Sequence, residues 1–175
     1  MARGRETETP QPDLSDPKAL RRAFGVYPTG VTVVTTLTDT GMPVGFTANS
    51  FTSVSLDPPL LLVCPSLSLG CLPAFSACTR FAVNILSDRQ QDVAETFASY
   101  SGDRFARIDW HIDPLGVPII DGGAAHFSCT VQDRHPAGDH IILLGRVEDW
   151  TRQDDGAPLT YAGGRYTRLS MQGAA

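Results

Sequence analysis

The densest group of polar side chains in this sequence lies between Gly45 and Pro59, in the run GFTANSFTSVSLDPP. Its hydroxyl and amide groups belong to Thr47, Asn49, Ser50, Thr52, Ser53 and Ser55. Short groups of this kind hydrogen-bond close to the main chain, and their small neighbours let a flat ring approach the backbone. The run therefore favours a site for a neutral, planar ligand with a phosphate tail. It equally fits a strand that continues into a loop whose serines and threonines cap a turn.

The sequence lacks the common motifs of nucleotide-binding proteins, serine hydrolases and zinc proteases. There is no G-x-G-x-x-G fingerprint for a dinucleotide and no G-x-S-x-G or H-E-x-x-H motif. Of the 14 basic residues, Lys18 is the only lysine, and it follows Pro17 rather than a glycine. A phosphate loop of the G-x-x-x-x-G-K-[ST] type is thereby excluded, and Lys18 is a poor Schiff-base candidate because it belongs to a helix that we expect to be exposed.

The four cysteines give no metal signature. Cys64, Cys71, Cys78 and Cys129 form no C-x-x-C pair, and no histidine lies at zinc-ligand spacing. We expect reduced structural thiols and no metal site.

Length and composition indicate one globular domain. The chain has 175 residues, 42% of them hydrophobic and 19% charged, with a net charge of -5. The acidic balance and the lack of a basic run argue against nucleic-acid binding. The longest apolar stretch, 58–65, is too short to span a membrane, and the charged first residues lack a signal core. A cytoplasmic protein that binds small molecules or proteins is expected.

The first elements can be predicted from composition and spacing. Residues 1–14 have almost nothing to bury and predict a disordered arm. Asp16 followed by Pro17 predicts the start of a helix. Spacing then gives this helix one apolar face, with Arg21 and Arg22 pointing away from it. The face consists of Leu20, Ala23, Phe24 and Tyr27.

The rest of the sequence, after this first helix, predicts short strands with few helices. β-branched runs, alternation and turn signals predict strands at 31–37, 43–51, 60–64, 81–86, 126–132 and 140–147. Helices are predicted at 69–77 and 88–100, the second capped by Asp88. Without regular β-α-β alternation, the pattern favours a mainly β fold: a small antiparallel barrel with helices over its ends. We assign residues 15–170 to this domain and 171–175 to a C-terminal tail.

Six segments together resemble the flavin reductase-like family. They occur in order over residues 18–170 and read YPTGVTVVTT (27–36), GFTANSFTSVSLDPPL (45–60), FAVNIL (81–86), GDRF (102–105), GDH (138–140) and GRY (164–166). Members of this family are short-chain NAD(P)H:flavin oxidoreductases, the small components of two-component flavin-dependent monooxygenases.

The resemblance implies a fold, a reaction and partners. The implied fold is the FMN-binding split β-barrel, a Greek-key-like antiparallel barrel, in a homodimer with flavin near the subunit interface. The implied reaction is hydride transfer from NADH or NADPH to FAD or FMN, and the reduced flavin would serve a partner monooxygenase. The flavin is then a dissociable substrate. NADH is favoured over NADPH, while the choice between FAD and FMN stays open.

The resemblance also assigns site residues. Thr47, Ala48, Asn49 and Ser50 match the segment that holds the isoalloxazine edge. Ser53 and Ser55 match positions near the ring or the ribityl chain, and Ser66 and Ser68 match a phosphate contact. Since no cation follows in CPSLSLGCL, Arg104 is the better anion ligand, with Phe105 packing on the cofactor. His140 and Tyr166 match the border of the nicotinamide pocket. No residue is assigned as a general acid or base, because the two cofactors carry the chemistry.

Other interpretations remain open for these residues. His140 is also an ordinary histidine after a turn, Arg104 could pair with Asp103 or Asp109, and Tyr166 could belong to the core. The same barrel occurs in non-catalytic flavin- or haem-binding proteins, where His140 or His126 would be the haem ligand, and in amine oxidases of the pyridoxamine phosphate type. A purely structural barrel that dimerises through residues 1–27 is a third possibility.

Overall fold

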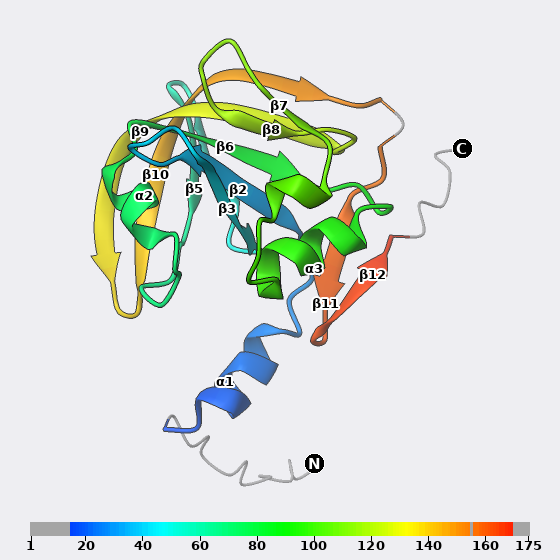
Figure 1. Ribbon diagram of the computed structural model, residues 1–175. Helices are drawn as coiled ribbons and strands as arrows, with labels where there is room; N and C mark the ends of the chain where they lie inside the picture. The colour runs from blue at the N-terminus through cyan, green and yellow to red at the C-terminus, as the bar shows by residue number, and fades with distance from the viewer. Residues whose placement is uncertain (1–14, 155, 170–175) are drawn as a thin grey trace, which may run out of the picture.

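A seven-stranded antiparallel sheet curls to form the body of the molecule (Figure 1). The computed structural model describes residues 15–154 and 156–169, so the predicted arm 1–14 and tail 171–175 lie outside the described residues. Along the sheet the strands are β3 (Pro43–Ala48), β2 (Thr32–Leu37), β6 (Arg80–Ile85), β9 (Ala125–Ala137), β10 (His140–Arg152), β5 (Pro59–Val63) and β4 (Thr52–Leu56). The predicted mainly β, antiparallel fold is confirmed.

The central strands are built for burial on both faces. In β2, residues 32–36 are all buried, and the threonines among them bond their hydroxyls to backbone carbonyls. Thr36, for example, donates to the carbonyl of Arg80 at 2.7 Å. Buried Asn84 of β6 donates to the carbonyl of Val33 and accepts a hydrogen bond from the backbone N–H of Ile120. Each of these buried polar side chains therefore has a partner, which lets β-branched residues fill the middle of the sheet.

Strands β9 and β10 form one long hairpin. Each has 13 residues, and only Gly138 and Asp139 form the turn between them. The sequence analysis ended the first of these strands at residue 132, which was wrong, because the strand continues to Ala137 and Pro136 pairs with Ile141 inside the hairpin. Gly138 has φ 62°, a left-handed conformation that suits a two-residue turn. The turn places His140 at the first position of β10.

Two small sheets complete the fold. One contains β1 (Thr29–Gly30), β11 (Leu159–Ala162) and β12 (Arg165–Arg168), in the order β1-β11-β12. The other pairs β7 (Trp110–Ile112) with β8 (Pro118–Ile120). The sequence analysis predicted none of these strands, nor β4 as a strand separate from β3.

Helix α3 (Gln91–Ser99) packs against β3 and covers a second hydrophobic core. Gly45 permits this contact, because a Cβ atom there would lie 3.0 Å from Phe97 of the helix. The helix begins at Gln91 and Asp88 does not cap it; the preceding Gln90 instead bonds to Ser87 and Asp121. Two further short helices are α2 (Leu72–Ala77), whose Phe75 lies in the hydrophobic core of the barrel, and η1 (Phe105–Arg107).

Helix α1 (Pro17–Phe24) stands away from the body (Figure 1). The predicted cap is confirmed, since the carboxylate of Asp16 accepts a 2.8 Å hydrogen bond from the backbone N–H of Lys18. The helix is exposed, as its sequence predicted, and within the described residues nothing buries its apolar face. No residue of α1 is buried, and Phe24 is 70% exposed.

Among the residues that the structure describes, no helix is long and apolar enough to cross a membrane.

Candidate functional site

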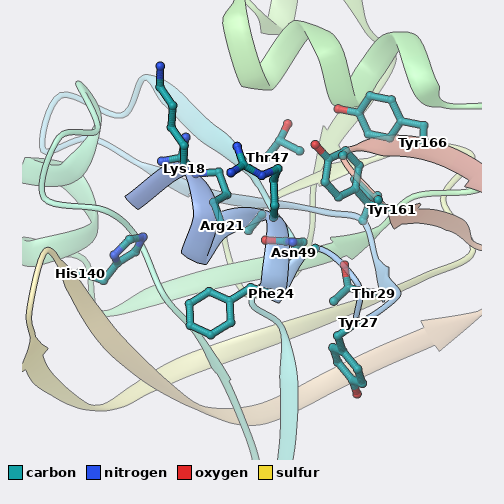
Figure 2. A pocket seen from close by; sticks show the side chains of 16 residues that line it. Lys18, Arg21, Phe24, Tyr27, Thr29, Thr47, Asn49, His140, Tyr161 and Tyr166 are labelled. Carbon is teal, nitrogen blue, oxygen red and sulfur yellow. The ribbon is translucent and has the colours of Figure 1, made fainter. Parts of the chain in front are cut away.

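A cavity of about 1070 Å³ separates α1 from the end of the barrel. We call it the α1 cavity. Its walls come from four parts of the chain: α1 with the segment after it, the end of β3, the first residue of β10, and the hairpin of β11 and β12. In Figure 2, His140 lies on one side, Tyr161 and Tyr166 lie on the other, and Asn49 lies between them. The fold therefore collects residues that are far apart in the sequence around one open space.

The end of β3 supplies the floor of the cavity through Thr47, Ala48 and Asn49. Thr47 donates a 2.6 Å hydrogen bond to the carbonyl of Ala94 in α3. The carbonyl of Ala48 accepts a 3.0 Å bond from the hydroxyl of Thr32. Asn49 is exposed, and among the described residues its carboxamide has no hydrogen-bond partner. Two positions are thus fixed by the fold, while the third keeps its full capacity to bond a ligand.

The bend after β3 is fastened by Ser50. Its hydroxyl accepts a 2.9 Å hydrogen bond from the backbone N–H of Cys64, just beyond β5. Ser53 and Ser55 follow on β4, where they pair with Leu61 and Leu60 around a β-bulge. These three serines do not line the α1 cavity.

His140 is oriented by the residue before it. Its Nδ1 lies 2.7 Å from Oδ1 of Asp139, and its side chain is 42% exposed. The hydrogen bond from His140 is the main cause that lowers the pKa of Asp139, followed by the charge of that histidine. Because an ionised carboxylate can only accept, Nδ1 carries the proton and Nε2 is left for another partner.

Ser66 and Ser68 lie beside His140 without lining the α1 cavity. Ser66 forms an isolated β-bridge with His140. The two serine hydroxyls are 2.9 Å apart, and that of Ser66 also accepts from the backbone N–H of Ser68. They therefore satisfy each other, which reduces what they offer to a phosphate.

Two tyrosines form the wall opposite His140. The rings of Tyr161 and Tyr166 meet edge to face, with centroids 5.4 Å apart. Burial raises the pKa of Tyr166, and Glu95 and Tyr161 raise it further. The phenol of Tyr166 consequently stays protonated at neutral pH and can donate a hydrogen bond.

Arg104 and Phe105 lie away from this cavity. Arg104 donates from Nε to the carbonyl of Tyr100 at 2.8 Å and from Nη1 to the carbonyl of Gly45 at 2.9 Å. Phe105 is 6% exposed and packs edge to face on Phe97 and Trp110 in the second core. In this structure, Arg104 braces the strand that leads to the site, and Phe105 fills the core beneath it.

The sequence analysis missed most of the residues that line the cavity. Lys18, Arg21 and Arg22 line it, and the analysis assigned none of the three to a binding site. Their spacing of i, i+3 and i+4, which places three cations on one helix face, was an available signal. Other lining residues that the analysis missed are Phe24, Tyr27, Thr29 and Tyr161. The hydroxyl of Thr29 is buried and has no partner among the described residues.

Comparison with known proteins gives one consistent result. The family model "Flavin reductase like domain" matches residues 24–170. A probable flavin reductase of Rhizobium meliloti (strain 1021) is 49% identical over 163 residues, which cover 93% of this chain and 52% of that protein. The chain thus spans about half the length of this relative. The FMN reductase (NADH) SmoA of Agrobacterium fabrum is 45% identical, with 92% and 91% covered.

A solved structure shares both fold and sequence with the chain. It is the NADH:FAD oxidoreductase SgcE6 of Streptomyces globisporus C-1027, in complex with NAD and FAD fragments. The two are 40% identical and superpose with a TM-score of 0.88, over 93% of this chain and 98% of that one.

Proposed function

The chain belongs to the flavin reductase-like family, and from this premise we propose that it transfers a hydride from NADH to FMN or FAD and supplies the reduced flavin to a separate monooxygenase. One observation carries the proposal. Thr47, Asn49, His140 and Tyr166, from three distant segments, line a single open cavity. Its volume of about 1070 Å³ lies just above the usual range for cofactor pockets, about 300–1,000 Å³. The relatives SmoA and SgcE6 bear the names of an NADH-dependent FMN reductase and an NADH:FAD oxidoreductase.

The floor of the cavity suits a flat, hydrogen-bonding ring. Ala48 presents only a methyl group, so a ring can approach the main chain there. The free carboxamide of Asn49 can donate and accept at the ring edge, and the orphaned hydroxyl of Thr29 offers a further polar contact. These residues fit a flavin, and we assign them, with Thr47 and Ser50 as supports, to flavin binding.

The protein's part in the reaction is positional. When both nucleotides are bound, the dihydronicotinamide ring supplies a hydride to the flavin ring and becomes the oxidised pyridinium. His140 and the protonated phenol of Tyr166 would orient the nicotinamide from opposite sides, so that the reacting atoms come within about 3–3.5 Å. Backbone N–H groups of the bend at residues 48–50 would stabilise the negative charge that grows on the reduced ring. No side chain has to move a proton.

We extend the proposal to a homodimer and a cytoplasmic location. Phe24, Val26 and Tyr27 are 70–78% exposed on and just after α1, and a second copy of the chain could cover them. All four cysteines are free thiols, as expected in a reducing compartment. A solution mass of twice 18.8 kDa by light scattering would support the dimer, and a monomer at micromolar concentration would oppose it.

A direct assay tests the enzyme. The purified protein is mixed with NADH and excess FMN, FAD or riboflavin under anaerobic conditions, and the loss of NADH absorbance is followed. Rapid NADH loss that requires flavin supports the reductase. A stable coloured complex without NADH loss would instead support a flavin-binding protein without turnover, and no flavin affinity at all would leave a structural barrel.

A further inference from the structure

Three cationic side chains form one wall of the α1 cavity. Lys18, Arg21 and Arg22 line it, and no carboxylate is found among the described residues that do so. The protein as a whole has a net charge of -5. Positive charge is therefore concentrated at this opening, where it would attract an anion into the cavity.

The charges of this wall are not neutralised by neighbours. Within the described ranges, the side chains of Lys18 and Arg21 have no hydrogen bond or ion pair. Arg22 is 3.9 Å from Asp16, and both side chains are exposed, so the pair is weak. Asp139 is near enough for Arg21 to contribute to the lowered pKa of its carboxyl, but only as the smallest cause. All three cations can therefore bind a ligand.

Structural needs of the helix do not explain the arrangement. Arg21 and Arg22 in the last turn complement the helix dipole, but that effect does not require a cation at Lys18 as well. Spacing at i, i+3 and i+4 directs all three toward one side of the helix, and all three line the same cavity as Asn49 and His140. Figure 2 shows Lys18 and Arg21 on the helix, among the side chains that line the cavity.

The other candidates for an anion are already occupied. The hydroxyls of Ser66 and Ser68 bond to each other, and the guanidinium of Arg104 donates to two backbone carbonyls. Neither group lines the α1 cavity.

We propose that Lys18, Arg21 and Arg22 form a phosphate-binding subsite, which holds the phosphate or pyrophosphate ester of a nucleotide whose ring lies on the floor formed by Thr47, Ala48 and Asn49. The inference rests on the proposed function, and it adds the residues that select phosphorylated over unphosphorylated substrates. Guanidinium groups suit this task because their planar donors match phosphate oxygens in pairs. The phosphate can belong to the flavin or to the nicotinamide nucleotide.

The test compares substrates that differ only in phosphate. The double variant Arg21→Gln/Arg22→Gln keeps good helix formers on an exposed helix. One arm compares FMN with riboflavin at fixed NADH. The other compares reduced nicotinamide mononucleotide with reduced nicotinamide riboside at fixed riboflavin. Equilibrium dissociation constants of the same four compounds, from their fluorescence, give the comparison without turnover.

We expect KM and Kd to rise at least tenfold for the phosphorylated member of one pair and less than twofold for its unphosphorylated partner. The arm that responds identifies the nucleotide. For that substrate, the wild-type protein should also lose affinity as salt is raised. Arg152→Gln is the matched control, because it removes one exposed arginine at the other end of β10 from His140.

The proposed subsite would be overturned if, for each of the four compounds, KM and Kd of the variant equalled those of the wild type. A parallel rise for riboflavin and FMN would also overturn it, since it would indicate a displaced helix rather than a lost phosphate contact. If the wild type binds flavin but does not oxidise NADH, the proposed function fails while the binding comparison still decides the subsite.

Discussion

The hydroxyl of Thr47 lies 2.6 Å from the carbonyl oxygen of Ala94, so the end of β3, which forms the candidate flavin floor, is bonded directly to α3. This bond joins the strand that ends at the α1 cavity to the helix that covers the second core. The position of the floor therefore depends on a contact on the far side of β3.

Replacing Thr47 with valine tests this connection. Thr47→Val keeps the shape of the side chain but removes the donor, so we expect a loss of about 1 kcal/mol in unfolding free energy. The KM for flavin should rise several-fold because the floor is less well fixed. Thr47→Ser, which keeps the hydroxyl, should restore both. A variant with unchanged stability and unchanged KM would show that the bond has no role in positioning.

Arg104 should affect flavin binding without discriminating between flavins. Arg104→Gln removes two charge-assisted bonds to the carbonyls of Tyr100 and Gly45, and about 1.5–3 kcal/mol of stability should be lost. Because the arginine braces β3, KM values for FMN and riboflavin should rise by the same factor. Arg89→Gln, at an exposed arginine without an ion pair among the described residues, is the control. A rise for FMN alone would instead assign Arg104 to the phosphate.

Asn84 should be essential for stability. Its side chain is fully buried and bonds to the carbonyl of Val33, the hydroxyl of Thr35 and the N–H of Ile120. Asn84→Ala leaves buried polar groups without partners, so we expect a loss of about 3 kcal/mol in chemical denaturation. Gln132→Ala, at an exposed position of β9, should change stability by less than about 0.5 kcal/mol. If Asn84→Ala lowered the unfolding free energy by less than about 1 kcal/mol, the hydrogen bonds of Asn84 would not have the stabilising role that we assign to them.

Cys129 should resist alkylation across the neutral range. Burial raises the pKa of this thiol to about 12, with a smaller contribution from Glu148. At pH 8 only about one part in ten thousand is then thiolate, the reactive form. Iodoacetamide should leave the native peptide that contains Cys129 unmodified and should modify it fully in guanidinium chloride, as measured by mass spectrometry. Equal labelling in the two conditions would exclude a closed core at this position.

The sequence predicted those parts of the site that are encoded locally. Asp16 with Pro17 predicts the start of α1, and the β-branched run at 31–37 predicts β2, because caps and strand patterns depend on near neighbours. The resemblance to a family drew attention to Asn49, His140 and Tyr166 across the whole chain, and the structure brings all three to one cavity.

The parts that were missed depend on long-range pairing. Strand β1 has only two residues, too few for a pattern, and its partner β11 lies about 130 residues further along the chain. Without that pairing, nothing in the sequence indicates that α1 meets Tyr161 and Tyr166. Arg104 was likewise assigned by its charge, whereas its two carbonyl partners follow only from the folded path of β3.

The hairpin of β11 and β12 has a consequence for biosynthesis. Gly163 and Gly164 at its turn have φ of 59° and 80°, and the N–H of Gly163 bonds to the carbonyl of Gly25 at the foot of α1. The helix is translated long before the hairpin that anchors it. A chain that ends before Tyr166 would therefore have most of its barrel but no completed cavity, so cofactor binding must await the synthesis and pairing of the last strands.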